Sequence, residues 1–251
     1  MELTEQQLTL FTSYNTTSAD TDMESRLRLG GIVDFLIQSA ISSADNLGFG
    51  FSNLRELQLF WVLRNLTVEI YRPIKWSEVV EVETWPKNIE GVLYLRDFVV
   101  RDSEKQVVAR ATSGWLAIDF ATKRPKRFNS EQMLYFTKLK EKNALPYAPI
   151  KLSAAACELS QQGIVTPTFF DIDLNRHVTS TRYIDWMVDT LPTDFLLTAY
   201  PAKLTINYLK ETMLGDTVAI CRGKADDGSF AFEGINQASG ATAFRGLVEY
   251  R

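Results

Sequence analysis

The side chains best suited to acid–base chemistry gather in one short stretch, residues 170–178. This stretch contains the only histidine of the chain, and it places Asp173, Asn175 and His177 at every second position. Alternate residues of an extended segment point to the same side. The spacing therefore predicts that a carboxylate, an amide and an imidazole converge on one face, as they do in an acid–base site.

The residues that follow favour a helix. Residues 179–181 carry hydroxyl groups suited to capping a first helical turn. Apolar residues at helical spacing continue to Leu191, and Pro192 ends the pattern. Because the free amides of a helix N-terminus favour negative charge, the start of this helix is suited to a developing oxyanion.

A structural role for each of these residues is also open. Aspartate and asparagine before a helix commonly bond to the local backbone, and a lone histidine often has a structural role. The alternating set of three favours a function over that interpretation.

The composition limits the class of protein. With 251 residues, of which 45% are hydrophobic and 23% charged, the chain is long enough for one large or two small globular domains. A net charge of −4 disfavours nucleic acid as a partner. The first residues lack the pattern of a signal peptide, and no apolar run reaches membrane-spanning length.

The ligand and nucleotide motifs of common cofactor enzymes are absent from the sequence. The single histidine and the two cysteines, Cys157 and Cys221, form no metal-ligand pattern, and no glycine-rich nucleotide motif occurs. We therefore expect no metal and no cofactor. With so few cysteines, a reducing, cytoplasmic location is the simplest expectation.

The elements that position these residues follow one another in two similar series. A broad apolar stripe after Gly30 and Gly31 predicts a buried helix in the first series. Strand-like segments then follow at residues 58–63, 66–71, 79–85, 92–100 and 107–118. In the second series a helix precedes strands at residues 203–209, 217–223, 230–235 and 241–250. This order indicates an α+β fold in which each helix packs against a sheet.

A gapless match between the two series indicates an internal duplication. Residues 66–72 align with residues 204–210, and in the same register Pro73 stands where the second half has Glu211. The first half contains no histidine. We therefore expect one active site per chain, built by His177 and Glu211 of the second half.

Two motifs resemble those of a known family. Residues 171–178 (DIDLNRHV) followed by residues 183–186 (YIDW) resemble the active-site segment of acyl-acyl carrier protein thioesterases. Residues 208–211 (YLKE) resemble the second motif of that family, and residues 119–125 resemble the link between its halves. The resemblance implies an α+β tandem double hot-dog, with two long helices each wrapped by an antiparallel β-sheet.

The resemblance also implies a division of labour along the chain. Residues 1–120 would form a non-catalytic hot-dog that holds the acyl chain, residues 121–163 a connector, and residues 164–251 the catalytic hot-dog. The implied activity is hydrolysis of the thioester of fatty acyl-acyl carrier protein, without a cofactor. Many plant members have a cysteine after the catalytic glutamate, where this chain has Thr212, which disfavours a cysteine mechanism.

By this resemblance, the family's catalytic residues fall on Asp173, Asn175, His177 and Glu211. In this hypothesis Glu211 is the general base for water, while Asn175 positions water or substrate. His177 orients the carboxylate or assists proton transfer, and the backbone amide of Val178 receives the oxyanion. Asp173 either orients this network or attacks as a nucleophile, and the sequence leaves both roles open.

Two surfaces are expected to recognise the substrate. Four apolar residues of the first half are candidates for the acyl pocket: Ile32, Phe35, Leu36 and Trp61. Four basic residues of the connector are candidates for docking the acyl carrier protein: Lys123, Arg124, Lys126 and Arg127. An acyl-CoA thioesterase, another hot-dog enzyme such as a dehydratase, and a non-catalytic acyl-binding protein stay open as alternatives. Assembly into a homodimer stays open too.

Overall fold

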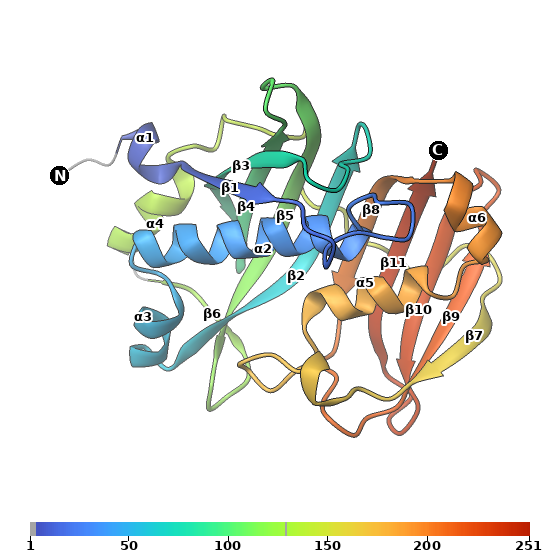
Figure 1. Cartoon of the computed structure of the whole chain (residues 1–251). Helices are drawn as coiled ribbons and strands as arrows, with labels where there is room; N and C mark the ends of the chain where they lie inside the picture. Colours follow the sequence, from blue (N-terminus) through green and yellow to red (C-terminus); the bar gives the residue numbers. More distant parts are fainter. Residues whose placement is uncertain (1–3, 129) are drawn as a thin grey trace.

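The computed structural model describes residues 4–128 and 130–251, and in this part of the chain eleven strands form one continuous antiparallel sheet (Figure 1). Two helices lie across the same face of the sheet, α2 (Leu29–Asn46) on the first half and α5 (Ser180–Val188) on the second. This is the α+β tandem double hot-dog expected from the sequence, with the two sheets fused edge to edge.

The remaining elements follow the two series in chain order. The first half contains α1 (Glu5–Leu8), β1 (Leu10–Asn15), α3 (Phe51–Glu56), β2 (Leu59–Ile70), β3 (Val79–Glu90), β4 (Leu93–Arg101) and β5 (Val107–Asp119). Next come β6 (Pro125–Lys126) and α4 (Ser130–Thr137). The second half contains β7 (Ser160–Val165), the short 3-10 helix η1 (Phe169–Asp171), α6 (Thr193–Thr198), β8 (Pro201–Tyr208), β9 (Val218–Lys224), β10 (Phe230–Asn236) and β11 (Thr242–Tyr250).

The order of the strands is symmetric about the centre of the sheet. It reads β1-β3-β4-β5-β2 in the first half and β8-β11-β10-β9-β7 in the second. The halves meet where β2 and β8 pair antiparallel, with Leu66 opposite Ile206. Each strand of one half thus has a counterpart in the other, which supports the internal duplication predicted from the sequence.

The long helix α2 is buried on most of its surface, as its broad apolar stripe predicted. Ile32, Val33 and Leu36 belong to the main core, which continues between α5 and the strands of the second half. A Cβ atom at Gly30 would lie 2.6 Å from the Asp185 carboxylate on α5. Glycine therefore permits the close approach of the two helix starts at the centre of the molecule.

Several boundaries differ from those predicted. The segments 58–63 and 66–71 are one strand, β2, because a β-bulge at Arg64 absorbs the polar interruption. The Arg64 guanidinium donates to the carbonyl of Tyr208 on β8. Strand β7 begins inside the expected connector, while α5 ends before the predicted Leu191. No described helix is long and apolar enough to cross a membrane.

Candidate active site

The stretch around His177 is a tight turn, so the prediction of an extended segment is wrong. Ile172 and Val178 form an isolated antiparallel bridge, and the chain reverses between them. The amide of Asp173 donates to the carbonyl of His177 at 2.8 Å. The φ angle of Arg176 is 65°, in the left-handed region. Alternating polar residues did not produce a strand because aspartate and asparagine also favour turns.

The Asp173 carboxylate stabilises this turn from within. Its Oδ1 accepts hydrogen bonds from the backbone amides of Asn175, at 2.8 Å, and His177, at 3.2 Å. This is an Asx-type arrangement, in which a side-chain oxygen replaces a backbone acceptor. Asp173 itself is exposed, whereas Asn175 and His177 are half-buried. The turn therefore fixes the position of the imidazole in the chain reversal.

His177 lies at the junction of the two halves. Its ring centroid is 6.2 Å from that of Phe60, at the start of β2 in the first half. Phe60 also packs against Phe120, with a centroid distance of 4.8 Å. The Nζ atom of Lys123 lies 5.3 Å from the centre of the Phe60 ring. The imidazole thus lies beside Phe60 of the first half, and Phe60 in turn contacts a second aromatic ring and a cation.

Glu211 follows β8 and reaches the same region through the backbone. The amide of Val178 donates to the carbonyl of Thr212 at 2.9 Å. His177 and Glu211 each precede one member of this bonded pair. The structure therefore joins the two motifs that the sequence separates, and Glu211 remains exposed.

The same hydrogen bond corrects the expected role of Val178. Because its amide already donates to Thr212, it is not free to bind an oxyanion, and that expectation is not met. The amide of Thr179 is also paired, with the carbonyl of Asp171 at 2.9 Å. The first turn of α5 remains the nearest place for an anion, as the sequence also indicated.

Asp171 anchors the turn to the neighbouring helix, a role that the sequence analysis missed. Its Oδ2 accepts from the amide and hydroxyl of Thr168, at 2.7 and 2.9 Å, and its Oδ1 from Arg182 Nε at 2.6 Å. Burial raises the pKa of Asp171, but the bonds from Thr168 and Arg182 outweigh it and leave the pKa below its ordinary value. The spacing of Thr168 and Asp171, a capping-box pattern, was the available signal.

The first half contains a copy of this turn at residues 20–27. Thr21 and Leu27 form the same isolated bridge, and the Asp22 amide donates to the Arg26 carbonyl at 2.8 Å. Asp22 Oδ1 accepts from the amides of Glu24 and Arg26, both at 2.9 Å, as Asp173 does in the second half. The backbone of the turn at residues 171–178, which is the candidate catalytic turn, is therefore present twice.

The copied turn carries different side chains. Arg26 stands at the position of His177 and Glu24 at that of Asn175. The Leu27 amide donates to the carbonyl of Ile74 at 2.7 Å, just as Val178 donates to Thr212. Pro73 thus occupies the place of Glu211, in agreement with the sequence alignment. The copy lacks the imidazole of His177 and the carboxylate of Glu211, which supports one active site per chain.

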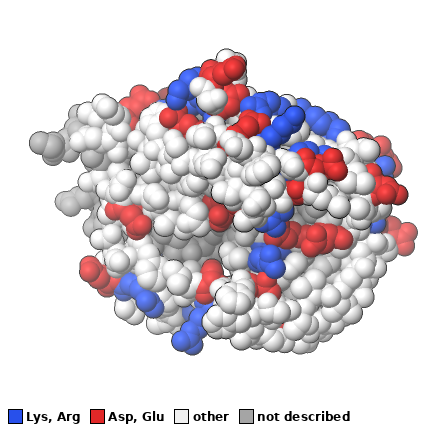
Figure 2. Space-filling model, in the orientation of Figure 1, with Lys and Arg blue, Asp and Glu red and all other residues white. Residues whose placement is uncertain are grey.

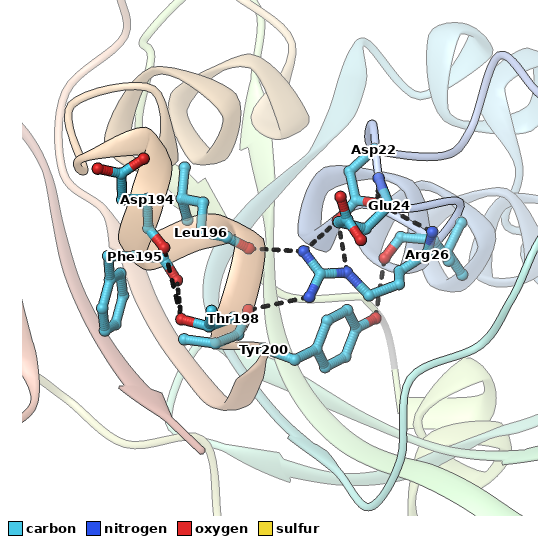
Figure 3. Close-up of polar contacts among 10 residues, drawn as sticks. Asp22, Glu24, Arg26, Asp194, Phe195, Leu196, Thr198 and Tyr200 are labelled. Carbon is cyan, nitrogen blue, oxygen red and sulfur yellow. Dashed lines mark hydrogen bonds and ion pairs between the residues drawn. The ribbon is translucent and has the colours of Figure 1, made fainter.

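Arg26 of the copied turn connects the two halves through hydrogen bonds of its guanidinium group to the second half (Figure 3). Its guanidinium donates to the carbonyls of Leu196, at 2.6 Å, and Ala199, at 3.2 Å, and lies over the Tyr200 ring. It also donates to Asp22 Oδ2 at 2.9 Å. A cavity of about 360 Å³ borders this turn, and three arginines and three aspartates line it. In Figure 2 positive and negative side chains are interspersed on this face, so the wall carries no excess of one charge.

A narrow, mainly apolar cavity lies in the first half, beneath the end of α2. Trp61 lines it, as expected, together with Ala40, Ile41, Ala44, Phe49, Pro86, Tyr94, Leu95, Arg96, Trp115 and Phe136. The other expected residues do not line it: Ile32 and Leu36 are core residues, and Phe35 stacks on Tyr14 with ring centroids 4.5 Å apart. The cavity lies farther along α2 than the sequence analysis placed it.

The expected basic residues of the connector differ in their surroundings. Lys126 forms an ion pair with Asp119 at 2.5 Å. Lys123 lies over Phe60, the ring that also contacts His177. Arg124 and Arg127 are exposed. Among the described residues, no group of three or more His, Cys, Asp or Glu is placed to hold a metal ion.

Comparison with known proteins identifies the family. Residues 7–135 match the model of the acyl-ACP thioesterase N-terminal domain, and residues 155–251 match that of the C-terminal domain. The chain therefore belongs to the acyl-ACP thioesterase family.

Relatives that match by sequence agree with this assignment. The chain is 30% identical over 203 residues to oleoyl-acyl carrier protein thioesterase 2, chloroplastic, of Arabidopsis thaliana, covering 74% of this chain and 55% of that protein. It is 25% identical over 236 residues to a dodecanoyl-[acyl-carrier-protein] hydrolase, chloroplastic, of Cinnamomum camphora, covering 88% and 62%. The chain thus spans little more than half the length of these relatives.

Two solved structures share the fold over nearly the whole chain. An acyl-ACP thioesterase from Bacteroides thetaiotaomicron superposes with a TM-score of 0.85 at 23% identity, covering 99% of this chain and 100% of that one. A 12:0-ACP thioesterase from Umbellularia californica gives 0.82 at 21% identity and 97% of both chains. Both support the double hot-dog architecture.

Proposed function

We propose that this protein hydrolyses the thioester of fatty acyl-acyl carrier protein, releasing a free fatty acid and the carrier thiol. The observation that carries the proposal is the hydrogen bond from Val178 to Thr212, since it joins the segments of His177 and Glu211. The site faces the first half, which contains the apolar cavity. Membership of the family and the names of its relatives support the same activity.

In the proposed reaction, Glu211 removes a proton from water as the water oxygen attacks the thioester carbonyl. The carbon–sulfur bond of the tetrahedral intermediate then breaks, and the carrier thiolate takes up that proton. His177 orients the Glu211 carboxylate or relays the proton, and Asn175 positions water or substrate. The start of α5 stabilises the developing oxyanion. An exposed carboxylate without an ion pair among the described residues suits Glu211 to this role.

We assign the orienting role to Asp173 rather than the nucleophilic one. One of its oxygens accepts two backbone amides and so is committed to the turn. Bond formation to carbon through the other oxygen would leave Oδ1 as a neutral ester carbonyl, which is a weaker acceptor for the two amides that close the turn before His177. An orienting role for Asp173 agrees with the two hydrogen bonds by which its carboxylate closes the turn.

The cavity beside Trp61 is the proposed site of the acyl chain, because its wall consists mainly of apolar and aromatic side chains. Lys123, Arg124 and Arg127 remain proposed contacts for the acyl carrier protein, whereas the charge of Lys126 is compensated by Asp119. The division at residues 120 and 163, a cytoplasmic location and a homodimer remain predictions from the sequence.

Matched substrates test this function. We expect faster hydrolysis of acyl groups on acyl carrier protein than of the same groups on coenzyme A. A preference for coenzyme A would favour an acyl-CoA thioesterase, and hydration of an enoyl thioester would favour a dehydratase. Tight binding of an acyl thioester without turnover would overturn the enzymatic proposal.

A further inference from the structure

Exposed apolar residues surround the catalytic turn, on the two segments that the hydrogen bond from Val178 to Thr212 joins. We define the apolar rim as five residues with exposed fractions between 43% and 92%: Phe169, Phe170, Leu174, Met213 and Leu214. The two phenylalanine rings contact each other edge to face, with centroids 5.5 Å apart. Exposed apolar side chains gathered in this way mark binding surfaces more often than isolated ones do.

The copied turn of the first half shows that the fold does not require this rim. Its backbone makes the same bridge and the same hydrogen bonds. Yet Ser18 and Ala19 occupy the positions of the phenylalanine pair, and Lys75 occupies that of Met213. Large apolar side chains remain at only two of the five positions, Met23 and Trp76. The catalytic half therefore carries apolar surface beyond what the turn needs.

The two turns also differ in the positively charged residues beside them. Arg176 and Lys210, which precede His177 and Glu211, are exposed and form no ion pair with any described residue. At the matching positions the copy has Ser25 and Arg72. Arg72 is compensated there, because it binds Glu78 at 2.9 Å and Asp102 at 2.8 Å. At these two matched positions, uncompensated positive charge occurs only in the catalytic half, although the copied turn has an exposed lysine, Lys75, at the position of Met213.

We propose that the apolar rim, with Arg176 and Lys210, is a docking surface for the carrier protein that delivers the acyl thioester, in addition to the contacts proposed above for the connector. This inference rests on the proposed function. A thioester on a tethered arm reaches His177 and Glu211 only when its carrier lies at the mouth of the site. The rim would contact apolar side chains of the carrier, and the two cations would face its carboxylates. An interface of this kind combines an apolar centre with a charged edge.

The test exchanges rim residues for those of the copied turn. In Phe169→Ser/Phe170→Ala we expect the Kd for acyl carrier protein, measured by fluorescence anisotropy, to rise about tenfold or more. Turnover of a small acyl thioester without the carrier should stay within twofold of wild type. Met23→Ser, which removes an exposed apolar side chain from the copied turn, serves as the matched control and should change neither quantity.

A second variant tests the charged edge of the surface. Arg176→Ser adopts the residue that the copy tolerates at the same backbone angle, and it should weaken the salt dependence of carrier binding. Unchanged carrier binding in both the Phe169/Phe170 and Arg176 variants would overturn the proposal. It would also be overturned if the phenylalanine exchange abolished binding to vesicles of anionic phospholipid and left carrier binding intact. Carrier binding is measured without turnover, so loss of the proposed hydrolysis would not be mistaken for loss of docking.

Discussion

At the scale of single residues, the proposed chemistry depends on which side chains already form hydrogen bonds within the protein and which are available to water and substrate. Asp173 is committed, because its Oδ1 accepts two backbone amides. Glu211 is exposed and makes no hydrogen bond or ion pair within the described residues. His177 is half-buried against Phe60. This distribution supports the proposed positioning role of Asp173 and the proposed role of Glu211 as the base that takes a proton from water.

Substitution of Asp173 separates its two proposed roles. Asp173→Asn retains an oxygen that can accept the two amides, so we expect kcat to fall by about tenfold at most. Asp173→Ala removes that acceptor and should lower kcat considerably more. The measurement is single-turnover hydrolysis of an acyl-carrier substrate. If Asp173→Asn were as inactive as Asp173→Ala, or if oxygen-18 from water entered Asp173, the nucleophilic role would be favoured instead.

At the scale of elements, the catalytic turn is held by its attachment to α5. Asp171 closes η1 onto Thr168 and binds Arg182 in the first turn of the helix. The pKa of Asp171 lies below its ordinary value, because these bonds outweigh the effect of burial. Its ionised form therefore stabilises the folded protein.

The sign of this pKa shift predicts a pH-dependent contribution to stability. A carboxyl group with a lowered pKa in the folded state contributes fully above its unfolded pKa of about 3.9, and the contribution is lost as pH falls through the folded value. We expect Asp171→Asn to lower the free energy of unfolding by about 2 kcal/mol at pH 7, measured by urea titration. The difference from wild type should shrink below about pH 4.

Asp189→Asn, at the C-cap of the same helix, provides a control of opposite sign. Asp189 is an exposed residue, but partial desolvation of its carboxyl group raises its pKa, so its charge opposes folding at neutral pH. Removing that charge should stabilise the protein at pH 7, and this gain should disappear at low pH. A loss in Asp171→Asn that stayed constant between pH 7 and pH 3 would contradict the assignment.

Periodicity predicted the elements whose side chains face a core. It identified α2 and the strands β3 to β5 and β8 to β11, since apolar stripes and alternation record which face is buried. Periodicity did not predict the bulge at Arg64 or the turn between Ile172 and Val178. Both depend on backbone hydrogen bonds, which the pattern of apolar side chains does not reveal. Of the residues expected to line the acyl pocket, Ile32 and Leu36 pack into the core, and the apolar cavity lies farther along α2.

At the scale of the whole molecule, duplication explains both the architecture and the single site. The matching strands could be recognised from the sequence, but the copied turn could not. Its residues 20–27 (DTDMESRL) share little with residues 171–178 (DIDLNRHV) beyond two aspartates. What the turns have in common is backbone geometry. One turn has His177 at the junction of the halves. The other has Arg26, which binds carbonyls of α6 and holds the junction together.

In the proposed function, the two halves have separate tasks. The first half contributes Phe60 and the apolar cavity, the connector contributes Lys123, and the second half contributes the turn and Glu211. Because the halves share one continuous sheet through β2 and β8, neither contribution is independent of the other. The central claim of the account is that His177 and Glu211 act together at this junction.

A double-mutant comparison tests that claim most directly, with kcat for an acyl-carrier substrate measured in His177→Ala, Glu211→Ala and the double variant. We predict that each single substitution lowers kcat by about a hundredfold or more, with folding unchanged by circular dichroism, and that the double variant loses at most about tenfold further. Near-wild-type turnover in either folded single variant, or a double variant whose losses multiply in full, would contradict a joint site.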